Sequence, residues 1–513
     1  MAGVVTRTTA DDPGATKADR GTAADRGAQR HVVVVGGGLA GLVAAWQLVT
    51  AERADGAPAL RVSVLEQSPR LGGKLASAEV AGITIEAGAE SVLARRPEFG
   101  QLTKQLGLAD SMVHPATSGA SLWTRGALRP LPPSLMGVPT DLRALAASGV
   151  LTPAELARVG WDLVLGEQPR QDDTDVATVI GSRLGYSVVD ALVEPLLGGV
   201  YAGHAGRLSF AATIPQLAGY TGPSLLQAAA AAIAPAAADQ PTVKRRPVFA
   251  GLEGGLGRLP GVLADRLLGH GVAIYTDSPV RALLRTPVGY DVVVGSASDT
   301  ARPAPRLIHA DAVVIALPGH PAARLLAEVS PPASLLIDQI EYASVALIAY
   351  AFASADLPEL PTGTGFLVPP SQGRSIKAAT YATQKWAWLD KAADDTVIVR
   401  VSVGRAREEQ LLQRDDLELI ALGLTDLTAA LGERLPPRTA PLDATVIRWG
   451  GALPQYAVGH LDRVAGVRAA LREQPRLTVA GAALDGVGIP AVIASARTAA
   501  HQILAELGMA DAR

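Results

Sequence analysis

The first long apolar run of the chain covers residues 32–35, consists only of valine, and ends directly on a glycine-rich turn. A short apolar run without polar alternation is typical of a strand buried in a parallel sheet. A helical pattern follows over residues 42–49, and a second apolar strand pattern over residues 60–65. The succession of strand, turn, helix and strand predicts a βαβ unit at the start of the fold.

The later part of the chain changes its hydrophobic period. Residues 97–230 carry mainly helical patterns, including amphipathic stretches at 99–106 and 154–165, whereas strand patterns prevail after residue 249. The expected strands there are residues 272–276, 280–284, 312–317, 345–352, 365–368, 376–381 and 396–403.

The end of the chain repeats the opening pattern. Residues 477–480 form a short apolar run that is followed by glycines and by a helical pattern from about residue 492 to residue 507. Because elements of this kind pack in layers around one core, we expect the run at 477–480 to add a last strand to the sheet that begins at residue 32.

Three glycines in the first turn carry the clearest chemistry. Gly36 permits a tight turn out of the strand, Gly38 lets the backbone approach a pyrophosphate, and Gly41 lets the helix sit close to the strand. The helix N-terminus then offers free N–H groups to phosphate oxygens. Glu66, at the end of the second strand and 25 residues after Gly41 (66 − 41), can accept hydrogen bonds from a ribose. The pattern therefore predicts a dinucleotide site.

The combined patterns predict an α/β fold with α+β insertions. The expected dinucleotide-binding domain is Rossmann-like and discontinuous, with a mainly helical domain and a substrate-binding β-sheet domain inserted in it. The expected boundaries are 31–95, 249–330 and 465–510 for the first domain, 96–248 for the second and 331–464 for the third. Residues 1–30 contain no apolar run, so we expect them to form a disordered leader.

Composition narrows the function classes. The chain has 513 residues and a net charge of −3, so it is long enough for two or three domains and shows no basic footprint for a nucleic-acid partner. It contains no cysteine, which excludes disulfides, iron–sulfur clusters and thiolate metal sites. The eight histidines are scattered, and we expect no metal site. Any redox chemistry must therefore reside on an organic cofactor.

One uncharged segment, residues 209–238, invites comparison with a membrane span. Pro215, Pro223 and Pro235 interrupt it, so it predicts short buried helices rather than a continuous apolar helix. We expect no membrane span and a cytoplasmic protein, and peripheral membrane contact stays open as an alternative.

A second glycine-rich loop follows Glu66 after four residues, with Arg70, Gly72, Gly73 and Lys74. A flavin dinucleotide extends past the first helix, and a glycine-rich loop with basic residues can line its phosphates and its isoalloxazine end. This loop favours FAD over NAD as the bound dinucleotide.

The motifs resemble those of a known family. Residues 66–74, together with the preceding Gly-Gly-Gly-Leu-Ala-Gly-Leu, are similar to the flavin monooxygenase/amine oxidase superfamily. Three further segments resemble the protoporphyrinogen/coproporphyrinogen III oxidase family: residues 194–203, residues 449–460 and residues 481–490. The likeness covers nearly all of residues 31–508. The Ala/Arg-rich composition is similar to that of the branch from Gram-positive bacteria, whose members oxidise coproporphyrinogen III.

The resemblance implies a fold of the p-hydroxybenzoate hydroxylase/amine oxidase type and non-covalently bound FAD. It implies that residues of the two glycine-rich loops hold the cofactor's phosphates, that a carboxylate binds its ribose, and that the backbone of a strand residue binds its adenine. Further residues would border the flavin ring. Together these residues are Gly36, Gly37, Gly38, Leu39, Ala40, Gly41, Glu66, Gln67, Lys74, Gly88, Ala89, Glu90, Ser91, Val280, Trp449, Val487, Gly488 and Ile489.

The resemblance also implies a substrate pocket. Gly199 would cover the macrocycle, Leu367 and Tyr381 would pack on it, and arginines would pair with its propionates. The candidate arginines are Arg95, Arg96 and Arg125.

The implied reaction is a six-electron oxidation in haem biosynthesis. Hydride would pass from the porphyrinogen to the flavin, and dioxygen would reoxidise the flavin and give hydrogen peroxide. No side chain is expected to act as an acid or base, and other haem-pathway enzymes are candidate partners. Protoporphyrinogen IX oxidation, amine oxidation, carotenoid desaturation and a prenyl-protein escort role stay open as alternatives.

Overall fold

The computed structural model describes residues 29–52, 59–167, 172–233, 247–295, 305–357 and 359–509. Most of the expected leader lies outside these residues, but its last two residues do not. Gln29 and Arg30 already belong to the first strand, and Arg30 pairs with Asp311 at 3.1 Å. The expected boundary at residue 30 is wrong by two residues, because pairing with the neighbouring strand extends the sheet in this direction.

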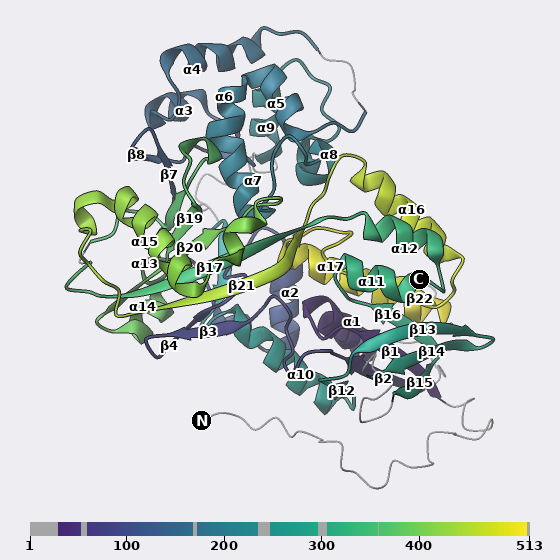
Figure 1. Cartoon of the computed structure of the whole chain (residues 1–513). Helices are drawn as coiled ribbons and strands as arrows, with labels where there is room; N and C mark the ends of the chain where they lie inside the picture. The colour runs from purple at the N-terminus through teal and green to yellow at the C-terminus, as the bar shows by residue number, and fades with distance from the viewer. Residues whose placement is uncertain are drawn as a thin grey trace.

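A five-stranded parallel sheet occupies the lower right of Figure 1, in the order β12-β2-β1-β16-β22. Its strands are β1 (Gln29–Val35), β2 (Ala59–Leu65), β12 (Ala273–Tyr275), β16 (Ala312–Ile315) and β22 (Leu477–Val479). The strand expected near the chain's end does join this sheet, since β22 pairs with β16 in parallel.

Alternate residues of β1 point to opposite faces of this sheet, and both faces are buried. Val32 and Val34 pack against α1 (Leu39–Thr50), α10 (Leu259–Gly269) and α17 (Ile489–Glu506). Val33 and Val35 belong to a second apolar cluster on the other face. That face is covered by β13 (Val280–Thr286), β14 (Gly289–Val294), β15 (Arg306–Ala310), α11 (Gly319–Leu326), α12 (Pro331–Asp338) and α16 (His460–Arg472). Burial on both faces explains the unbroken valine run.

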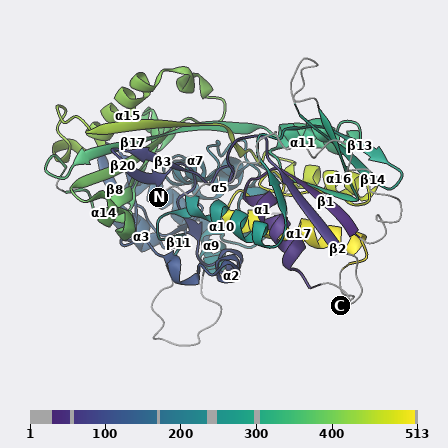
Figure 2. The same cartoon turned by 90° about the horizontal axis from the view of Figure 1, so that it is seen from below.

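A seven-stranded sheet lies beside the parallel sheet, as Figure 2 shows from below, in the order β21-β17-β20-β19-β18-β7-β8. Its strands are β7 (Ser121–Thr124), β8 (Ala127–Pro130), β17 (Tyr342–Ala353), β18 (Gly365–Leu367), β19 (Ile376–Tyr381), β20 (Thr396–Val403) and β21 (Asp443–Pro454). Residues 97–230 are mainly helical, as expected, but β7 and β8 were not expected there; β7 pairs in parallel with β18 and so extends this sheet.

The two faces of the seven-stranded sheet differ in their cover. The outer face packs against α15 (Asp416–Leu431) through one apolar cluster. Part of the inner face contacts the hairpin of β3 (Ser77–Val80) and β4 (Ile83–Glu86), and two short helices, α13 (Ala382–Lys385) and α14 (Ala387–Ala393). The inner face of the seven-stranded sheet is therefore the face that contacts the N-terminal segment containing β3 and β4.

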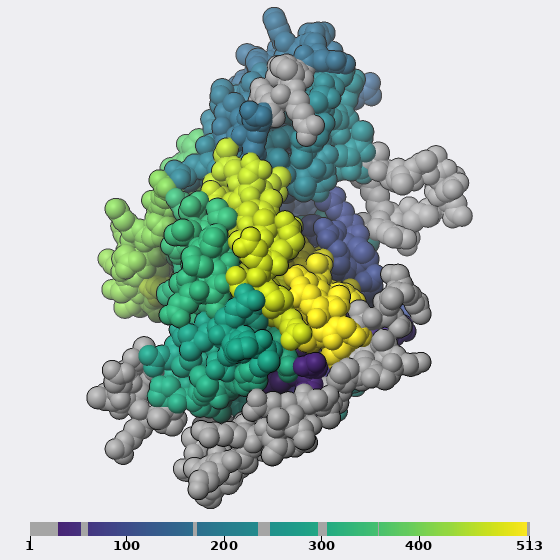
Figure 3. All heavy atoms as spheres, turned by 90° about the vertical axis from the view of Figure 1, so that its right-hand side faces the viewer, coloured from purple at the N-terminus to yellow at the C-terminus, as the bar shows by residue number. Residues whose placement is uncertain are grey.

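Helices form the upper part of the molecule in Figure 1 and the blue region of Figure 3. They are α3 (Leu142–Ser148), α4 (Pro153–Gly160), α5 (Val176–Leu184), α6 (Tyr186–Val188), α7 (Glu194–Val200), α8 (Phe210–Thr213) and α9 (Leu225–Ile233). They share one apolar core, and the buried ion pair of Arg183 with Asp162, at 2.6 Å, fastens the loop after α4. A π-helical turn, Val189–Val193, leads directly into α7.

The remaining elements are short connections around the two sheets. They are α2 (Pro97–Leu106), β5 (Val92–Leu93), β6 (Met112–Val113), β9 (Ser134–Leu135), β10 (Val138–Pro139) and β11 (Phe249–Leu252). In the described part of the chain, no helix is long and apolar enough to cross a membrane. The uncharged segment breaks into α8, a 3-10 helix (Pro215–Leu217) and α9, as expected of short helices, although its residues 234–238 lie outside the described residues.

Candidate active site

The turn from β1 into α1 is built on glycines that allow no side chain. Gly36 has a φ of +109°, and a Cβ atom there would lie 2.5 Å from the carbonyl oxygen of Ala316. A Cβ atom on Gly41 would lie 1.8 Å from the carbonyl oxygen of Gly36. Gly38 differs, because a Cβ atom on it would meet Gly73 Cα as its nearest atom, at 3.9 Å. Gly36 and Gly41 therefore fix the turn, while Gly38 leaves open space above it.

Glu66 lies at the mouth of this turn. Its carboxylate accepts hydrogen bonds from Gly37 N at 2.7 Å and from Ser68 N at 2.8 Å. Its backbone oxygen accepts from Ser278 N, which brings the start of β13 and Val280 to the same edge of the sheet. The structure thus brings three sequence-predicted groups together, whereas the neighbouring Gln67 side chain is exposed.

The second glycine loop runs beside the first turn. Gly72 N donates to Gly37 O at 2.8 Å, and Gly38 and Gly72 form an isolated parallel bridge. Both Gly72 and Gly73 have positive φ angles, which glycine adopts without strain. The guanidinium of Arg70 lies 5.7 Å from the ring centroid of Trp449. The loop therefore connects the phosphate end of the turn with the predicted flavin border.

Lys74, the last residue of that loop, is a buried amine without a carboxylate partner among the described residues. Its Nζ lies 5.8 Å from the ring centroid of Tyr342, and burial lowers the pKa of its side chain to about 8. A desolvated ammonium group is costly unless an anion compensates it. Lys74 thus fits a site for a phosphate-bearing ligand.

Residues 87–91 form the next wall of the site. Trp449 Nε1 donates to Ala87 O at 2.7 Å, and Arg400 Nη2 donates to Gly88 O at 3.2 Å. A Cβ atom on Gly88 would lie 2.0 Å from Lys74 O, so the two loops are in close contact. Within the described residues, the backbone N–H groups of residues 88–91 donate to no acceptor. This arrangement fits a ligand with polar edges.

A buried charged cluster supports this wall. Glu90 pairs with Lys385 and, at 2.7 Å, with Arg400, and Glu86 accepts from the backbone N–H of Leu256 and of Gly257. The cations hold the pKa of Glu90 below its usual range, whereas burial raises the pKa of Glu86 to about 7. Sequence reasoning missed Lys385 and Arg400. The one available signal was a single arginine inside the apolar strand β20.

The N-terminus of α17 closes the site from the other end of the chain. Gly488 is its N-cap, and Val492 N is the first amide to bond back to it, at 3.0 Å. Tyr456 Oη accepts from Gly486 N at 2.7 Å and fixes the loop before the helix. Val487 packs on the helical core that Leu367 also contacts. The predicted flavin border and the predicted pocket therefore meet here.

The three segments that carried the family resemblance contact one another. Gln455 Nε2 donates to Tyr201 O at 2.7 Å, and a Cβ atom on Gly203 would lie 2.3 Å from Gln455 Oε1. Tyr456, the next residue, holds Gly486. Residues 194–203, 449–460 and 481–490 are thus one structural unit.

The structure separates the predicted pocket residues. A Cβ atom on Gly199 of α7 would lie 3.8 Å from Leu367 Cδ2, so this helix residue lies next to Leu367 on the inner face of the sheet. Tyr381 does not join them: it is only 1% exposed and packs with Phe366 in the cluster beneath α15. The expectation that Tyr381 lines the substrate pocket is wrong, because its side chain lies on the outer face of the sheet.

The three candidate arginines do not converge. Arg96 pairs with Glu98 at the start of α2, and Arg125 pairs with Glu155 at 2.7 Å from the turn between β7 and β8. Arg95 is exposed and precedes α2. The structure therefore gathers no common anion site from them.

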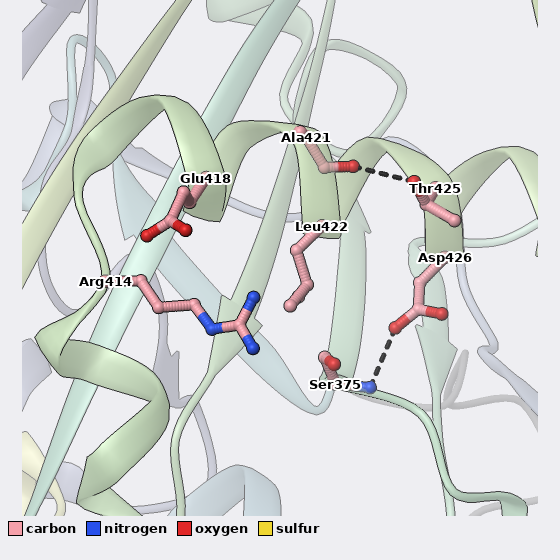
Figure 4. A pocket seen from close by; sticks show the side chains of 7 residues that line it. All are labelled: Ser375, Arg414, Glu418, Ala421, Leu422, Thr425 and Asp426. Carbon is pink, nitrogen blue, oxygen red and sulfur yellow. Dashed lines mark hydrogen bonds between the residues drawn. The ribbon is translucent and has the colours of Figure 1, made fainter.

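A shallow pocket of about 430 Å³ lies elsewhere, between α15 and the start of β19 (Figure 4). Asp426 projects from α15 into it and accepts from Ser375 N at 2.8 Å. This pocket is on the outer face of the seven-stranded sheet, opposite the face that carries Leu367 and Trp449. None of the predicted site residues lines it.

Comparison with known proteins identifies the family. The family model for flavin-containing amine oxidoreductases matches residues 39–504, which indicates a flavin cofactor. The chain is 33% identical to the coproporphyrinogen III oxidase of Mycobacterium leprae over 486 residues and 30% identical to that of Bacillus subtilis over 483 residues. Each match covers 93% of this chain and 99% of the relative.

Solved structures share the fold. A protein from Exiguobacterium sp. 255-15 superposes with a TM-score of 0.77 at 32% identity, covering 93% of this chain and 99% of its own. The cyclohexylamine oxidase of Brevibacterium oxydans superposes with a TM-score of 0.66 at 17% identity over the same shares, and so shows the fold alone. The chain therefore belongs to the flavin-containing amine oxidoreductases, in the branch that includes the coproporphyrinogen III oxidases of Mycobacterium leprae and Bacillus subtilis.

Proposed function

We propose that the protein binds FAD non-covalently and oxidises coproporphyrinogen III to coproporphyrin III, with dioxygen as the acceptor and hydrogen peroxide as the by-product. The observation that carries this proposal is the near full-length similarity to enzymes named for that activity, at 33% and 30% identity. The intact glycine turn and the unpartnered Lys74 support the cofactor part of it.

Different residues of this chain would bind different parts of the cofactor. The turn with Gly36, Gly37, Gly38, Leu39, Ala40 and Gly41 would hold the pyrophosphate, with Lys74 beside it. Glu66 would bind the ribose, and Val280 the adenine. The backbone N–H groups of residues 88–91 and 487–489, with Trp449, would border the flavin.

The flavin, when bound, supplies the redox chemistry by accepting hydride from the substrate. The protein orients the two molecules and excludes water. Gly199 and Leu367 would contact the macrocycle, because Gly199 of α7 lies next to Leu367 on the inner face of the sheet. Arg95 stays a candidate for a propionate, since no ion pair occupies it in the described structure.

The proposal extends to organisation and place in the cell. We assign residues 31–95, 249–330 and 465–510, together with Gln29 and Arg30 of β1, to the FAD-binding domain. We assign residues 331–464, together with β7 and β8, to the substrate domain, and the rest of 96–248 to the helical domain. We place the reaction in the cytoplasm, in haem biosynthesis, where enzymes that supply the porphyrinogen or take the porphyrin are candidate partners.

The test begins with the purified chain, which should absorb in the flavin band and release FAD on denaturation. Anaerobic mixing with coproporphyrinogen III should then bleach the flavin, and air should restore it with formation of peroxide. A chain that takes up no flavin contradicts the whole proposal. A flavin that bleaches faster with protoporphyrinogen IX, or only with an amine, retains FAD binding and contradicts the substrate.

A further inference from the structure

The buried cluster of Glu86, Glu90, Lys385 and Arg400 has no role in the hydride transfer. The side chains of Glu90, Lys385 and Arg400 are all less than one-sixth exposed. Burying charges costs free energy that ion pairing rarely exceeds, so a cluster of this kind is weak evidence for a purely stabilising role. Its place behind residues 87–91 suggests that it acts on what those residues contact.

The cluster carries unequal charge. Lys385 and Arg400 bring two cations, and Glu90 brings one carboxylate that pairs with both. Glu86 is the fourth member and interacts electrostatically with Arg400 and Glu90. Glu90, Lys385 and Arg400 together therefore have a net charge of +1 behind Gly88, and burial, which raises the pKa of Glu86, limits how far that carboxyl offsets it.

Arg400 transmits this charge to the site through one peptide group. Its Nη2 donates to Gly88 O at 3.2 Å. The carbonyl of Gly88 and the N–H of Ala89 belong to the same planar trans peptide and point in opposite directions. A cation on the carbonyl oxygen polarises that peptide and makes its N–H a stronger donor. In the described structure the Ala89 N–H has no acceptor, so it is available to a ligand.

We propose that Arg400, anchored by Glu90, is a positioning residue that aims and polarises the peptide between Gly88 and Ala89 toward the bound flavin and so raises the flavin's reduction potential. The inference rests on the proposed function, because it needs a flavin along residues 88–91. Reduction adds negative charge to the flavin, and a positive cluster behind a donor N–H stabilises that charge.

Two substitutions of the cluster have opposite expected signs. Arg400→Gln removes the positive charge and should lower the midpoint potential of the bound flavin. It should also weaken flavin binding about tenfold, because Gly88 O loses its charge-assisted donor and the Ala89 N–H is no longer held toward the ligand. Glu90→Gln removes a negative charge and should raise the potential. If the cluster only attaches residues 87–91 to the sheet, both substitutions should lower the melting temperature and leave the midpoint potential unchanged.

The experiment measures the midpoint potential of the flavin-loaded full chain by dye-coupled titration, with the melting temperature as a second readout. Arg448→Gln is the matched control, because Arg448 is an exposed arginine on β21, the edge strand of the same sheet, where it pairs with Asp416. Arg400→Lys, which keeps the charge, should shift the potential less than Arg400→Gln and serves if the glutamine variant does not fold.

The outcomes separate the two proposals. A wild-type chain that takes up no flavin overturns both of them. A loaded Arg400 variant with wild-type potential, in a protein whose wild type oxidises the porphyrinogen, overturns this inference alone. Opposite shifts in the Arg400→Gln and Glu90→Gln variants, with none in the control, support it.

Discussion

Gly41 lies so close to Gly36 that a Cβ atom on Gly41 would be 1.8 Å from the Gly36 carbonyl oxygen. The helix α1 and the turn that precedes it are therefore held together by the absence of one methyl group. We expect Gly41→Ala to force them apart, at a cost of about 3 kcal/mol in the free energy of unfolding, and to abolish flavin binding. Thermal unfolding and flavin absorbance measure the two effects.

Gly38→Ala is the matched control for this prediction. A Cβ atom there would meet no atom closer than 3.9 Å, so the melting temperature should stay near that of the wild type. Flavin binding should still weaken, because the methyl group would occupy the open side of the turn. Equal unfolding of the two variants would contradict the distinct roles given to the two glycines.

Lys74 predicts how flavin binding depends on pH. Burial lowers the pKa of its amine to about 8 in the free protein, and a pyrophosphate beside it would raise that pKa again. Binding above pH 8 must then take up a proton, so affinity should be constant below pH 8 and fall by up to about tenfold per pH unit above it. Isothermal titration between pH 6 and about 9.5 measures the slope. The slope should vanish in Lys74→Gln, and its persistence there would contradict the assignment.

Glu86 predicts a pH dependence of stability with the opposite sign to that of an ordinary salt-bridged carboxylate. Burial raises its pKa from 4.5 in the unfolded chain to about 7 in the folded protein. Between these values the unfolded state has lost the proton that the folded state keeps. The contribution to stability is therefore complete below pH 4.5, declines as the pH rises toward 7, and is constant above that, with at most about 3 kcal/mol at stake.

The comparison of wild type with Glu86→Gln isolates this contribution. Chemical unfolding at a series of pH values should show the wild type losing stability relative to the variant between pH 4.5 and 7. A difference that stays constant over this interval would mean that Glu86 is ionised in the folded protein at all these values.

Two adjacent glycines of α7 have different expected roles: Gly198 is needed for packing, and Gly199 contacts the substrate. A Cβ atom on Gly198 would lie 2.3 Å from Nη1 of the buried Arg405, whereas one on Gly199 would meet only Leu367 at an ordinary 3.8 Å. Gly198→Ala should push the end of the Arg405 side chain aside and cost about 1 kcal/mol in the free energy of unfolding. Gly199→Ala should leave the melting temperature unchanged and raise the KM for the porphyrinogen. Similar KM values in wild type and Gly199→Ala would remove Gly199 from the pocket.

The sequence predicted those features that local physics decides. The glycine turn, the position of Glu66 and the apolar strand that became β22 all depend on residues close together in the chain. The charged cluster could not be predicted in the same way, because Arg400 and its partner Glu90 are 310 residues apart. Strands β7 and β8, four residues each, were missed since their pairing with β18 decides their structure.

Tyr381 shows a different reason for failure. Its strand, β19, pairs with β20 through an irregular register between Ile376 and Ala378. A shift of one residue turns every following side chain to the opposite face of a sheet. The alternating pattern of β19 identifies a strand, but it does not show where this irregularity falls, and so it did not show that Tyr381 faces α15.

The order of strands in the parallel sheet also constrains how this chain is made. β16 ends at Ile315, and its neighbour β22 begins at Leu477, 162 residues later (477 − 315). At a synthesis rate of about 5–20 residues per second, β22 is made about 10–30 s after β16, and until then this edge of β16 has no partner strand. During that interval an unpaired strand edge is a template for aggregation. Production of the protein should therefore depend on slow growth and on chaperones that cover this edge until the ribosome releases β22.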